Sequence, residues 1–355
     1  MSTIVITGGH HNSALVVAKL LIKKNCKVVW IGHRHSSRGD VVDSAEYLEV
    51  TASGIKFHDL QAGKMVLSLR EIFQFPLGVS QAFKLLKKIK PTAILSFGGY
   101  LGGTVALAGK SLSIPIFLHE QTVTAGRANK LIGSLAKKIY LTWPESAKYF
   151  SAKKTQVVGL PLRDGILTSP QKSFFTRHKP TLLVMGGKQG AHAINQFIFN
   201  NLGDLLTNFN LIHQTGTSSL TGDYTSALAL KNTLGSLADC YLPLGYIGEQ
   251  EIGDYLHNAD YYLGRSGAHI CYELGIVGLK SILVPLMSTH DHEQHKNAQI
   301  IVKAKQGIIL SQSDLRFTSF LSVYKKLISQ KPIKLNLADN ASDLLVADLL
   351  SELKS

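Results

Sequence analysis

The chain has few cysteines, few charged residues and no long apolar run. Its three cysteines, Cys26, Cys240 and Cys271, lie far apart and form no CxxC pair. This spacing argues against a disulfide framework or a thiolate zinc site and favours a reducing compartment, with the cytoplasm as the default. No apolar stretch approaches the ~20 residues that a membrane-spanning helix needs, and the N-terminus does not resemble a signal peptide. We therefore expect any membrane contact to be peripheral.

Charge is scarce but unbalanced. Of the 355 residues, 17% are charged and 45% are hydrophobic, which is enough for two domains that each bury a core. The 38 Lys and Arg residues exceed the 24 Asp and Glu residues and give a net charge of +14. Such an excess favours an anionic partner, namely nucleic acid, a membrane surface or a phosphorylated substrate. No RNP, zinc-finger or KH motif is present, so we do not expect nucleic acid to be the partner.

Short apolar segments rich in β-branched residues alternate with helix-length segments. The first half contains STIVIT, KVVWIG, TAILSF, IPIFLH, KIYLT and TQVVG, and the pattern restarts with PTLLVMGG, NLIHQTG, DCYLPLGYI, YYLGRSG and KSILVPL. This alternation is typical of parallel sheets wound with helices. We expect an α/β chain with two doubly wound, Rossmann-like domains at residues 1–162 and 181–335, a polar linker at 163–180 and a closing helix within 336–355.

Both halves begin with a strand, a glycine turn and a helix. Such a turn directs backbone N–H groups and a helix N-terminus at the crevice, where a phosphate group binds well. The first turn, TGGHHNS, is not GxGxxG, and no acidic residue clearly ends the strand KVVWIG, so a nicotinamide site is disfavoured. A tight turn without a ligand remains the alternative. It does not explain why His10 and His11 follow the two glycines.

Two later turns are also rich in glycine or polar residues. The segment FGGYLGGTVALAG places Tyr100 after a strand, and FLHEQTVTAGRANKLIG places His119, Glu120 and Gln121 after another. Ligand loops of doubly wound sheets occur at these strand ends. Close helix packing through small residues, or a buried polar network, is the alternative.

In the second half, Glu273 stands in the otherwise apolar segment GRSGAHICYELGIVG. A buried carboxylate is costly unless it is paired or faces a polar ligand, and a ribose diol satisfies both of its oxygens. The segment STHDHEQHKNA then brings several histidines together, including His290 and His292. Their spacing matches no established zinc-ligand pattern, so we expect no metal and no other cofactor.

The segment PLGVSQAFKLLKKIKP has an amphipathic pattern. Val79, Phe83 and Leu86 recur at helical spacing, and they are flanked by Lys84, Lys87, Lys88 and Lys90. This pattern suits a helix that lies on an anionic membrane surface. It equally suits a core helix with a solvated lysine edge.

Seven motifs, in order over nearly the whole chain, carry a resemblance to a known family. They are TGGH, FGGYLGG, LHEQTVTAGRANKL, GGKQGAHAIN, HQTG, RSGAHICYE and DHEQHKNA. The chain resembles the MurG family of GT-B glycosyltransferases, which add N-acetylglucosamine to undecaprenyl-pyrophosphoryl-muramoyl pentapeptide in peptidoglycan synthesis. The resemblance implies two Rossmann-like domains that face each other across a cleft. It also implies UDP-N-acetylglucosamine (UDP-GlcNAc) as donor, a lipid-linked acceptor and a place on the cytoplasmic side of the plasma membrane.

The resemblance also implies roles for individual residues. His10 takes the place of the family's candidate base, Glu273 is expected to hold the ribose hydroxyls and Gln294 the donor sugar. The residues assigned to the acceptor are Gly8, Gly9, Tyr100, His119, Glu120 and Gln121. The residues assigned to the donor are Thr7, Asn129, Arg163, Lys188, Gln189, Ile247, Ser266, Gly267, Glu273, Glu293, Gln294 and Asn297.

Several motifs depart from the family pattern. The first glycine pair of GGTGGH is lost in VITGGH, and Thr122, Lys188 and Glu293 replace the family's Asn, Ser and Gln. These positions belong to the donor and acceptor contacts. They leave open a GT-B enzyme with another UDP-sugar or lipid-linked acceptor, and a catalytically silent UDP-sugar-binding protein. A UDP-N-acetylglucosamine 2-epimerase, a related enzyme, is disfavoured because both halves match the MurG motifs.

Overall fold

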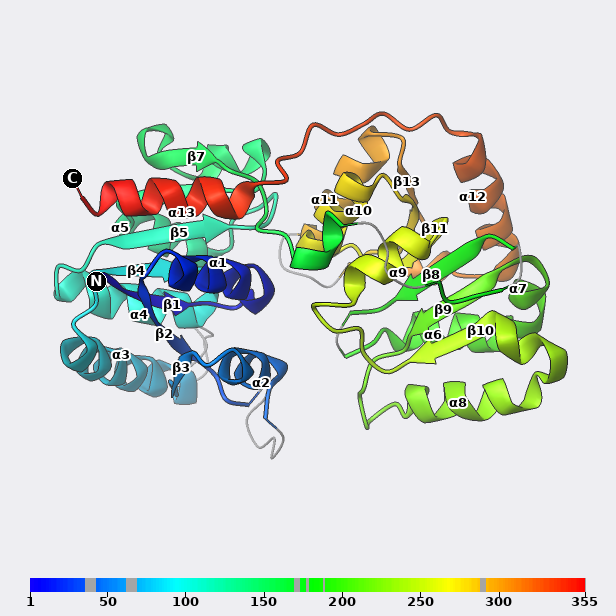
Figure 1. Cartoon of the computed structure of the whole chain (residues 1–355), viewed down its shortest axis with the longest axis horizontal. Coiled ribbons are helices and arrows are strands. Elements are labelled where there is room, and N and C mark those ends of the chain that lie inside the picture. Colours follow the sequence, from blue (N-terminus) through cyan, green and yellow to red (C-terminus); the bar gives the residue numbers. More distant parts are fainter. Residues whose placement is uncertain are drawn as a thin grey trace. The chain divides into compact units, whose positions relative to one another are not determined.

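The computed structural model describes residues 1–35, 43–61, 69–168, 173–176, 179–187, 189–287 and 292–354, with the backbone alone for 69–74 and 164. The chain divides into two compact units (Figure 1). Unit 1 comprises Met1–Leu162 and Ala338–Ser355, and unit 2 comprises Arg163–Leu337. Each unit is described by itself below.

Unit 1 is built on a seven-stranded sheet in the order β3-β2-β1-β4-β5-β6-β7. The strands are β1 (Thr3–Thr7), β2 (Lys27–Gly32), β3 (Lys56–Asp59), β4 (Ala93–Ser96), β5 (Ile116–Glu120), β6 (Lys138–Leu141) and β7 (Thr155–Val157). All of these strands pair in parallel, and Thr7 at the end of β1 lies in register with Ile31 and Ser96. The carboxyl ends of the strands therefore meet at one edge of the sheet.

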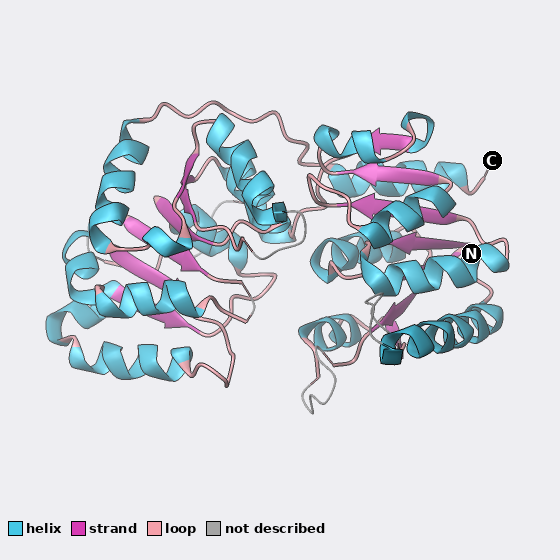
Figure 2. Ribbon diagram, turned by 180° about the vertical axis from the view of Figure 1, so that it is seen from behind, coloured by secondary structure: helices cyan, strands magenta, loops and turns pink. Residues whose placement is uncertain are grey.

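Helices cover both faces of this sheet (Figure 2). The helices of unit 1 are α1 (His11–Lys23), α2 (Ala45–Ala52), α3 (Leu69–Ile89), α4 (Gly99–Ser111), α5 (Arg127–Leu135) and α13 (Ala341–Glu352). Alternate residues of β1 point to opposite faces: Ile4 and Ile6 pack with α1, α2 and α13, whereas Val5 packs with α3, α4 and α5. Strands buried on both faces explain the continuous apolar runs in the sequence.

Of the two interpretations of the amphipathic segment in α3, the apolar face on a membrane surface is wrong and the core helix is correct. Leu86 is fully buried, and Val79 and Phe83 pack against the same core cluster as β1 and β4. The apolar face of the helix therefore covers the sheet, since each of the two surfaces must bury its apolar side chains against another element. Lys84 and Lys87 are exposed and form the solvated edge of a core helix.

Unit 2 is built on a six-stranded parallel sheet in the order β10-β9-β8-β11-β12-β13. The strands are β8 (Thr181–Met185), β9 (Asn210–Gln214), β10 (Tyr241–Leu244), β11 (Tyr261–Gly264), β12 (Lys280–Leu283) and β13 (Gly307–Ile309). One face packs against α6 (His192–Asn200), α7 (Leu202–Asn208), α8 (Asp223–Thr233) and α12 (Phe317–Ser329). The remaining helices are α9 (Ile252–Asn258), α10 (Ala268–Val277) and α11 (Glu293–Lys303). Within the described residues, no helix is both long and apolar enough to cross a membrane.

The C-terminal helix α13 packs on unit 1. Leu345, Val346 and Leu349 are buried in the same cluster as α1. Its Asp348 carboxylate accepts hydrogen bonds from Lys138 Nζ at 2.5 Å and from Tyr140 Oη at 2.9 Å. The end of the chain thus returns to the first unit after unit 2 is complete.

Candidate functional site

Each sheet has one point where the order of its strands reverses. In unit 1 this point lies between β1 and β4, and in unit 2 it lies between β8 and β11. In open α/β sheets, ligands bind in the crevice at the carboxyl ends of the two strands at this point. The turns after β1, β4, β8 and β11 contain several of the site residues that the sequence analysis predicts, and most of the others lie at or after the ends of β5, β7, β10 and β12.

The first glycine turn of unit 1 needs glycine for steric reasons. Gly8 has φ +133°, and a Cβ there would lie 2.7 Å from the carbonyl carbon of Phe97. The N–H of Gly9 donates to the carbonyl oxygen of Gly98 at 3.2 Å. The turns after β1 and β4 are therefore packed backbone against backbone. Thr7, just before the turn, is fully buried, and its Oγ1 has no hydrogen-bond partner within the described residues.

The two histidines of this turn have different surroundings. His10 is the N-cap residue of α1 and is partly exposed, and its side chain makes no capping hydrogen bond. The Nε2 of His11 lies 2.9 Å from Oε2 of Glu49 in α2. His11 is thus engaged in a contact between two helices, whereas His10 lies beside the predicted ligand crevice.

A buried carboxylate holds the second glycine turn. The N–H of Gly99, which has φ +77°, donates to Oδ1 of Asn129 at 2.9 Å, and Nδ2 of Asn129 donates to Oε2 of Glu120 at 2.7 Å. The other oxygen of Glu120 accepts from the N–H and the Oγ1 of Thr122 at 3.0 and 3.1 Å. Glu120, Thr122 and Asn129 therefore form a buried network, the alternative considered for the residues after β5.

The other predicted residues of unit 1 lie at the same strand ends. The hydroxyl of Tyr100 lies 2.7 Å from Nε2 of His33, which follows β2. The Nε2 of His119 donates to the carbonyl oxygen of Gly159 at 3.0 Å. Gln121 is fully buried, and neither its Oε1 nor its Nε2 has a hydrogen-bond partner in the described part of the chain. Most buried side-chain amides in proteins are hydrogen-bonded, so this amide is a candidate contact for a polar ligand.

In unit 2, Glu273 forms a buried ion pair. The Nε and Nη2 of Arg163 donate to its two carboxylate oxygens at 2.8 and 2.5 Å, and Glu273 is fully buried. Burial alone raises the pKa of Glu273, but the Arg163 guanidinium and His269 outweigh it and hold that pKa below its ordinary value. Glu273 is therefore charged at neutral pH. Each carboxylate oxygen of Glu273 can accept a second hydrogen bond, so the carboxylate can bind a ligand hydroxyl while it stays paired with Arg163.

The turn after β11 is connected to the start of α11. The Oγ of Ser266 donates to the carbonyl oxygen of Gln294 at 2.9 Å, and Nδ2 of Asn297 donates to the carbonyl oxygen of Ser266 at 3.4 Å. The Oε1 of Gln294 accepts from the N–H of Leu286 at 2.9 Å. Gly267 is the N-cap residue of α10. The N-terminus of α10 therefore lies directly after β11 at the carboxyl edge of the sheet, a position where helix N-termini bind anions.

The other residues predicted to bind the UDP-sugar are spread over several segments of unit 2. Gln189 is exposed in the turn after β8, Ile247 is buried after β10, and Glu293 is partly exposed as the first residue of α11. Lys188 lies outside the described residues, as does His290. Among the residues that the structure does describe, no group of three or more His, Cys, Asp or Glu side chains is arranged to hold a metal ion.

Sequence reasoning missed a set of buried polar residues in unit 2. Asn195 and His213 are fully buried and Asp223 is nearly so, and all three are hydrogen-bonded to one another or to the turn after β9. A signal was present in the sequence, because His213 follows the apolar Leu211 and Ile212 of a strand and Asn195 follows the apolar Ile194 of a helix. His33 was missed as well, and no pattern in the sequence connects it with Tyr100.

Comparison with protein families gives two matches. The model of the glycosyltransferase family 28 N-terminal domain matches residues 3–141, and the model of the family 28 C-terminal domain matches residues 181–352. Together they span most of both units.

Among individual proteins, one from Francisella philomiragia is 31% identical over 96% of this chain and 92% of its own length. One from Clostridium botulinum is 27% identical over 95% of this chain and 94% of its own. Both are named UDP-N-acetylglucosamine--N-acetylmuramyl-(pentapeptide) pyrophosphoryl-undecaprenol N-acetylglucosamine transferase.

Solved structures share the fold at lower identity. MurG of Acinetobacter baumannii superposes with a TM-score of 0.71 at 22% identity, over 99% of this chain and 100% of that one. The UDP-GlcNAc 2-epimerase of Neisseria meningitidis, bound to UDP-GlcNAc, superposes with a TM-score of 0.68 at 16% identity over the same shares. The GT-B fold is thus common to transferases and epimerases, and the fold alone does not choose between them.

Proposed function

The chain belongs to the MurG family of glycosyltransferases, and on that premise we propose that it transfers N-acetylglucosamine from UDP-GlcNAc to lipid-linked muramoyl pentapeptide, converting lipid I to lipid II in peptidoglycan synthesis. The observation that carries the proposal is the agreement of sequence and topology: the glycine-containing family motifs TGGH, FGGYLGG, GGKQGAHAIN and RSGAHICYE follow β1, β4, β8 and β11, the strands between which each sheet reverses its order. The identity of 31% over nearly the full length of a relative with this name supports it.

The reaction we propose is a single displacement with inversion. His10 takes the proton of the acceptor hydroxyl as its oxygen attacks the anomeric carbon of N-acetylglucosamine. The bond from that carbon to the diphosphate oxygen breaks, and UDP leaves with the bonding electron pair. The N-terminus of α10 after Gly267 stabilises the charge on the departing diphosphate. This scheme needs neither a metal nor another cofactor.

Binding of the two substrates is divided between the units in this proposal. In unit 2, Glu273 accepts hydrogen bonds from the ribose hydroxyls and Gln294 contacts the sugar of the donor, and Asn297 belongs to the same set of donor contacts. In unit 1, the acceptor is bound at the glycine turns after β1 and β4, which lie at the carboxyl edge of the sheet where phosphate groups commonly bind. The unpartnered amide of Gln121, which lies at the same edge, supports a polar ligand there.

We also propose a peripheral position on the cytoplasmic side of the plasma membrane. A lipid-linked acceptor must be reached at a membrane surface, and the net charge of +14 favours an anionic one. Because the apolar face of α3 is in the core, the attraction is assigned to exposed lysines and not to insertion of that face.

Two alternatives follow from the motif departures at Thr122, Lys188 and Glu293. One is a transferase for another UDP-sugar or lipid-linked acceptor, and the other is a silent UDP-sugar-binding protein. Thermal unfolding with UDP and with several UDP-sugars tests binding, since a ligand at 100 times its Kd adds ~2.7 kcal/mol of apparent stability. UDP-GlcNAc is expected to raise Tm more than other UDP-sugars. The absence of any shift would count against the transferase and the silent binder alike.

A further inference from the structure

A chain of buried hydrogen bonds crosses unit 2 beneath the turns after β8 and β9. At its centre is Asn195 of α6, which is fully buried. Its Nδ2 donates to the carbonyl oxygen of Thr215 at 2.8 Å and to Oδ2 of Asp223 at 2.7 Å. Its Oδ1 lies 3.0 Å from Nε2 of His213. One side chain thus connects a helix, a strand and the turn between β9 and α8.

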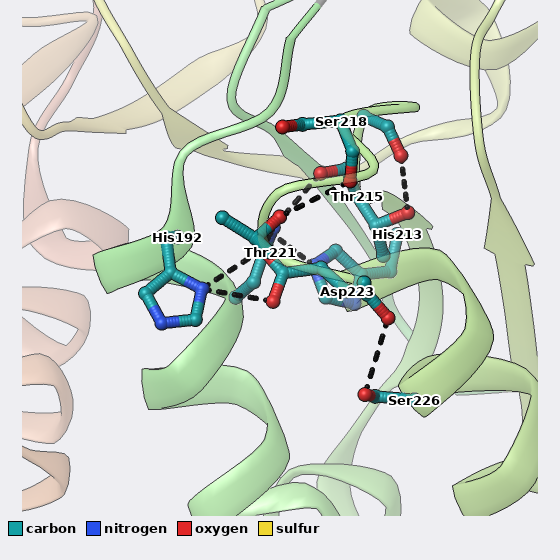
Figure 3. Close-up of polar contacts among 10 residues, drawn as sticks. His192, His213, Thr215, Ser218, Thr221, Asp223 and Ser226 are labelled. Atoms are coloured by element: carbon teal, nitrogen blue, oxygen red, sulfur yellow. Dashed lines mark hydrogen bonds and ion pairs between the residues drawn. The ribbon is translucent and has the colours of Figure 1, made fainter.

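The direction of each hydrogen bond in this chain is determined. Burial lowers the pKa of His213 to about 3, although the Asp223 carboxylate raises it, so the ring is neutral and carries one N–H. Because Oδ1 of Asn195 only accepts, that N–H is at Nε2, and Nδ1 of His213 accepts from the hydroxyl of Tyr241 at 3.0 Å. At the other end, the Asp223 carboxylate accepts from Nδ1 of the exposed His192 at 2.9 Å (Figure 3).

This chain fixes the contact between two glycine turns. A Cβ at Gly190, in the turn after β8, would lie 2.0 Å from the carbonyl oxygen of Thr215, and a Cβ at Gly216 would lie 2.2 Å from the N of Gly190. The two backbones therefore touch, and the same Thr215 carbonyl accepts from Asn195. Gln189, a predicted donor contact, directly precedes Gly190. A shift of Thr215 is transmitted to that turn because no space separates the two.

We propose that Asn195 and Asp223 are positioning residues for the UDP-sugar donor, which hold the turns after β8 and β9 at the separation that donor binding requires. This inference rests on the proposed function of the chain. Neither residue touches the donor in this account. Their effect is exerted through the Thr215 carbonyl and the turn that contains Gln189 and Gly190, so they influence donor affinity and leave the chemical step unchanged.

The test uses variants whose effects differ in electrostatics. Asn195→Ala removes the N–H group that donates to the Thr215 carbonyl. Asn195→Asp removes the same N–H group and also places a second carboxylate against Asp223. We expect each to raise the donor KM and the Kd for UDP by about tenfold or more, with kcat at saturating donor within about threefold of wild type. The double variant Asn195→Asp, Asp223→Asn removes the repulsion between the two carboxylates, because the amide at position 223 can donate to the carboxylate at position 195. It leaves the Thr215 carbonyl without its hydrogen-bond donor, so the affinity for UDP is expected to recover only to the level of Asn195→Ala.

Asn201→Ala is the matched control. Asn201 Nδ2 donates to the carbonyl oxygen of Phe197 at 2.7 Å, so this variant also loses a side-chain hydrogen bond, at the end of the same helix. We expect an unchanged donor KM and Kd for UDP, and Tm is measured for every variant. If Asn195→Asp does not fold, Asn195→Ala carries the test.

The outcomes separate this inference from the proposed function. A folded Asn195→Ala variant with the donor KM of wild type, or an Asn195→Asp defect that Asp223→Asn does not relieve, would overturn the inference. Equal losses of affinity in Asn195→Ala and Asn201→Ala would do the same, because they would indicate a general effect on stability. A wild-type chain that binds no UDP would instead overturn the proposed function itself.

Discussion

At the scale of the residue, His10 and His11 follow the same two glycines but differ in their surroundings. His11 contacts Glu49 across two helices, whereas His10 caps α1 beside the predicted crevice. An imidazole within reach of the acceptor hydroxyl can act as a general base. The proposal therefore assigns proton transfer to His10 and a packing role to His11.

His10→Ala is expected to lower kcat by roughly 10²- to 10⁴-fold while donor KM changes little, because a general base acts only as the new bond forms. Steady-state kinetics with varied UDP-GlcNAc separates the two constants. The control is His11→Ala, which loses its contact with Glu49 and is expected to keep most of the activity. A severe defect in His11→Ala beside a mild one in His10→Ala would reverse the assignment.

Glu273 and Arg163 are a second pair whose roles can be separated. Glu273→Ala removes hydrogen bonds to a ribose that does not react, so the donor KM is expected to rise more than kcat falls. It also leaves the buried Arg163 without its counter-ion, and breaking such a pair commonly costs about 3–5 kcal/mol of stability. Kinetics and urea unfolding on the same samples measure both effects.

The double variant Arg163→Ala, Glu273→Ala distinguishes binding from folding. With both charges gone, stability is expected to recover, because no unpaired charge stays buried. Donor KM is expected to remain high. If donor affinity returned together with stability, Glu273 would be a structural residue and not a ribose ligand.

At the scale of the element, β9 carries a titratable group into the core of unit 2. The pKa of His213 is about 3 in the folded protein because of burial, against an ordinary value of 6.5. The unfolded chain therefore binds a proton that the native state does not bind when the pH falls below about 6.5, and stability declines as pH falls. The loss is up to about 1.4 kcal/mol per pH unit.

The urea midpoint for unit 2 is expected to fall between pH 7 and pH 5 in the wild type, and to fall less in His213→Gln. This window avoids Glu273, whose lowered pKa makes its ion pair with Arg163 lose stability only at more acidic pH. Identical pH dependence in the two proteins would mean that His213 is already charged, or accessible, in the folded state.

The strands of the two sheets differ in how well the sequence predicts them. The central strands, such as β1 and β8, are continuous apolar runs that the periodicity analysis finds. The edge strands β3 (Lys56–Asp59) and β13 (Gly307–Ile309) were missed. They are short and only partly buried, so they carry neither a long apolar run nor a clear alternation.

Two features of the candidate site illustrate what a pattern cannot specify. The amphipathic pattern of α3 correctly indicates an apolar face, but it does not say whether a sheet or a lipid covers it. Glu120 and Asn129 were predicted as ligand residues from motif position, and the structure adds that they hold the second glycine turn. Networks between distant segments depend on the tertiary fold, which local spacing does not contain.

At the scale of the whole molecule, the charge of +14 is expected to produce salt-sensitive binding to anionic vesicles. Replacing the exposed Lys84, Lys87 and Lys88 with glutamate is expected to weaken co-sedimentation, since each lysine near the surface contributes about 1 kcal/mol. Tm is expected to change little, because these side chains lie outside the core.

The control for the vesicle experiment carries the same change of net charge in unit 2, at the exposed residues Lys303, Lys325 and Lys326. It is expected to bind vesicles more tightly than the α3 variant. Equal binding by the two variants would mean that net charge, and not the lysine edge of α3, directs the chain to the membrane.

The central claim is that the chain joins N-acetylglucosamine to a lipid-linked muramoyl pentapeptide. The most direct measurement offers UDP-GlcNAc, labelled in the sugar, and a short-chain lipid I analogue to the purified protein, and follows the label. The account predicts that the label appears in the lipid product with one UDP released per sugar transferred. Label that stays on UDP, is released as free sugar, or returns as an epimerised UDP-sugar would contradict it.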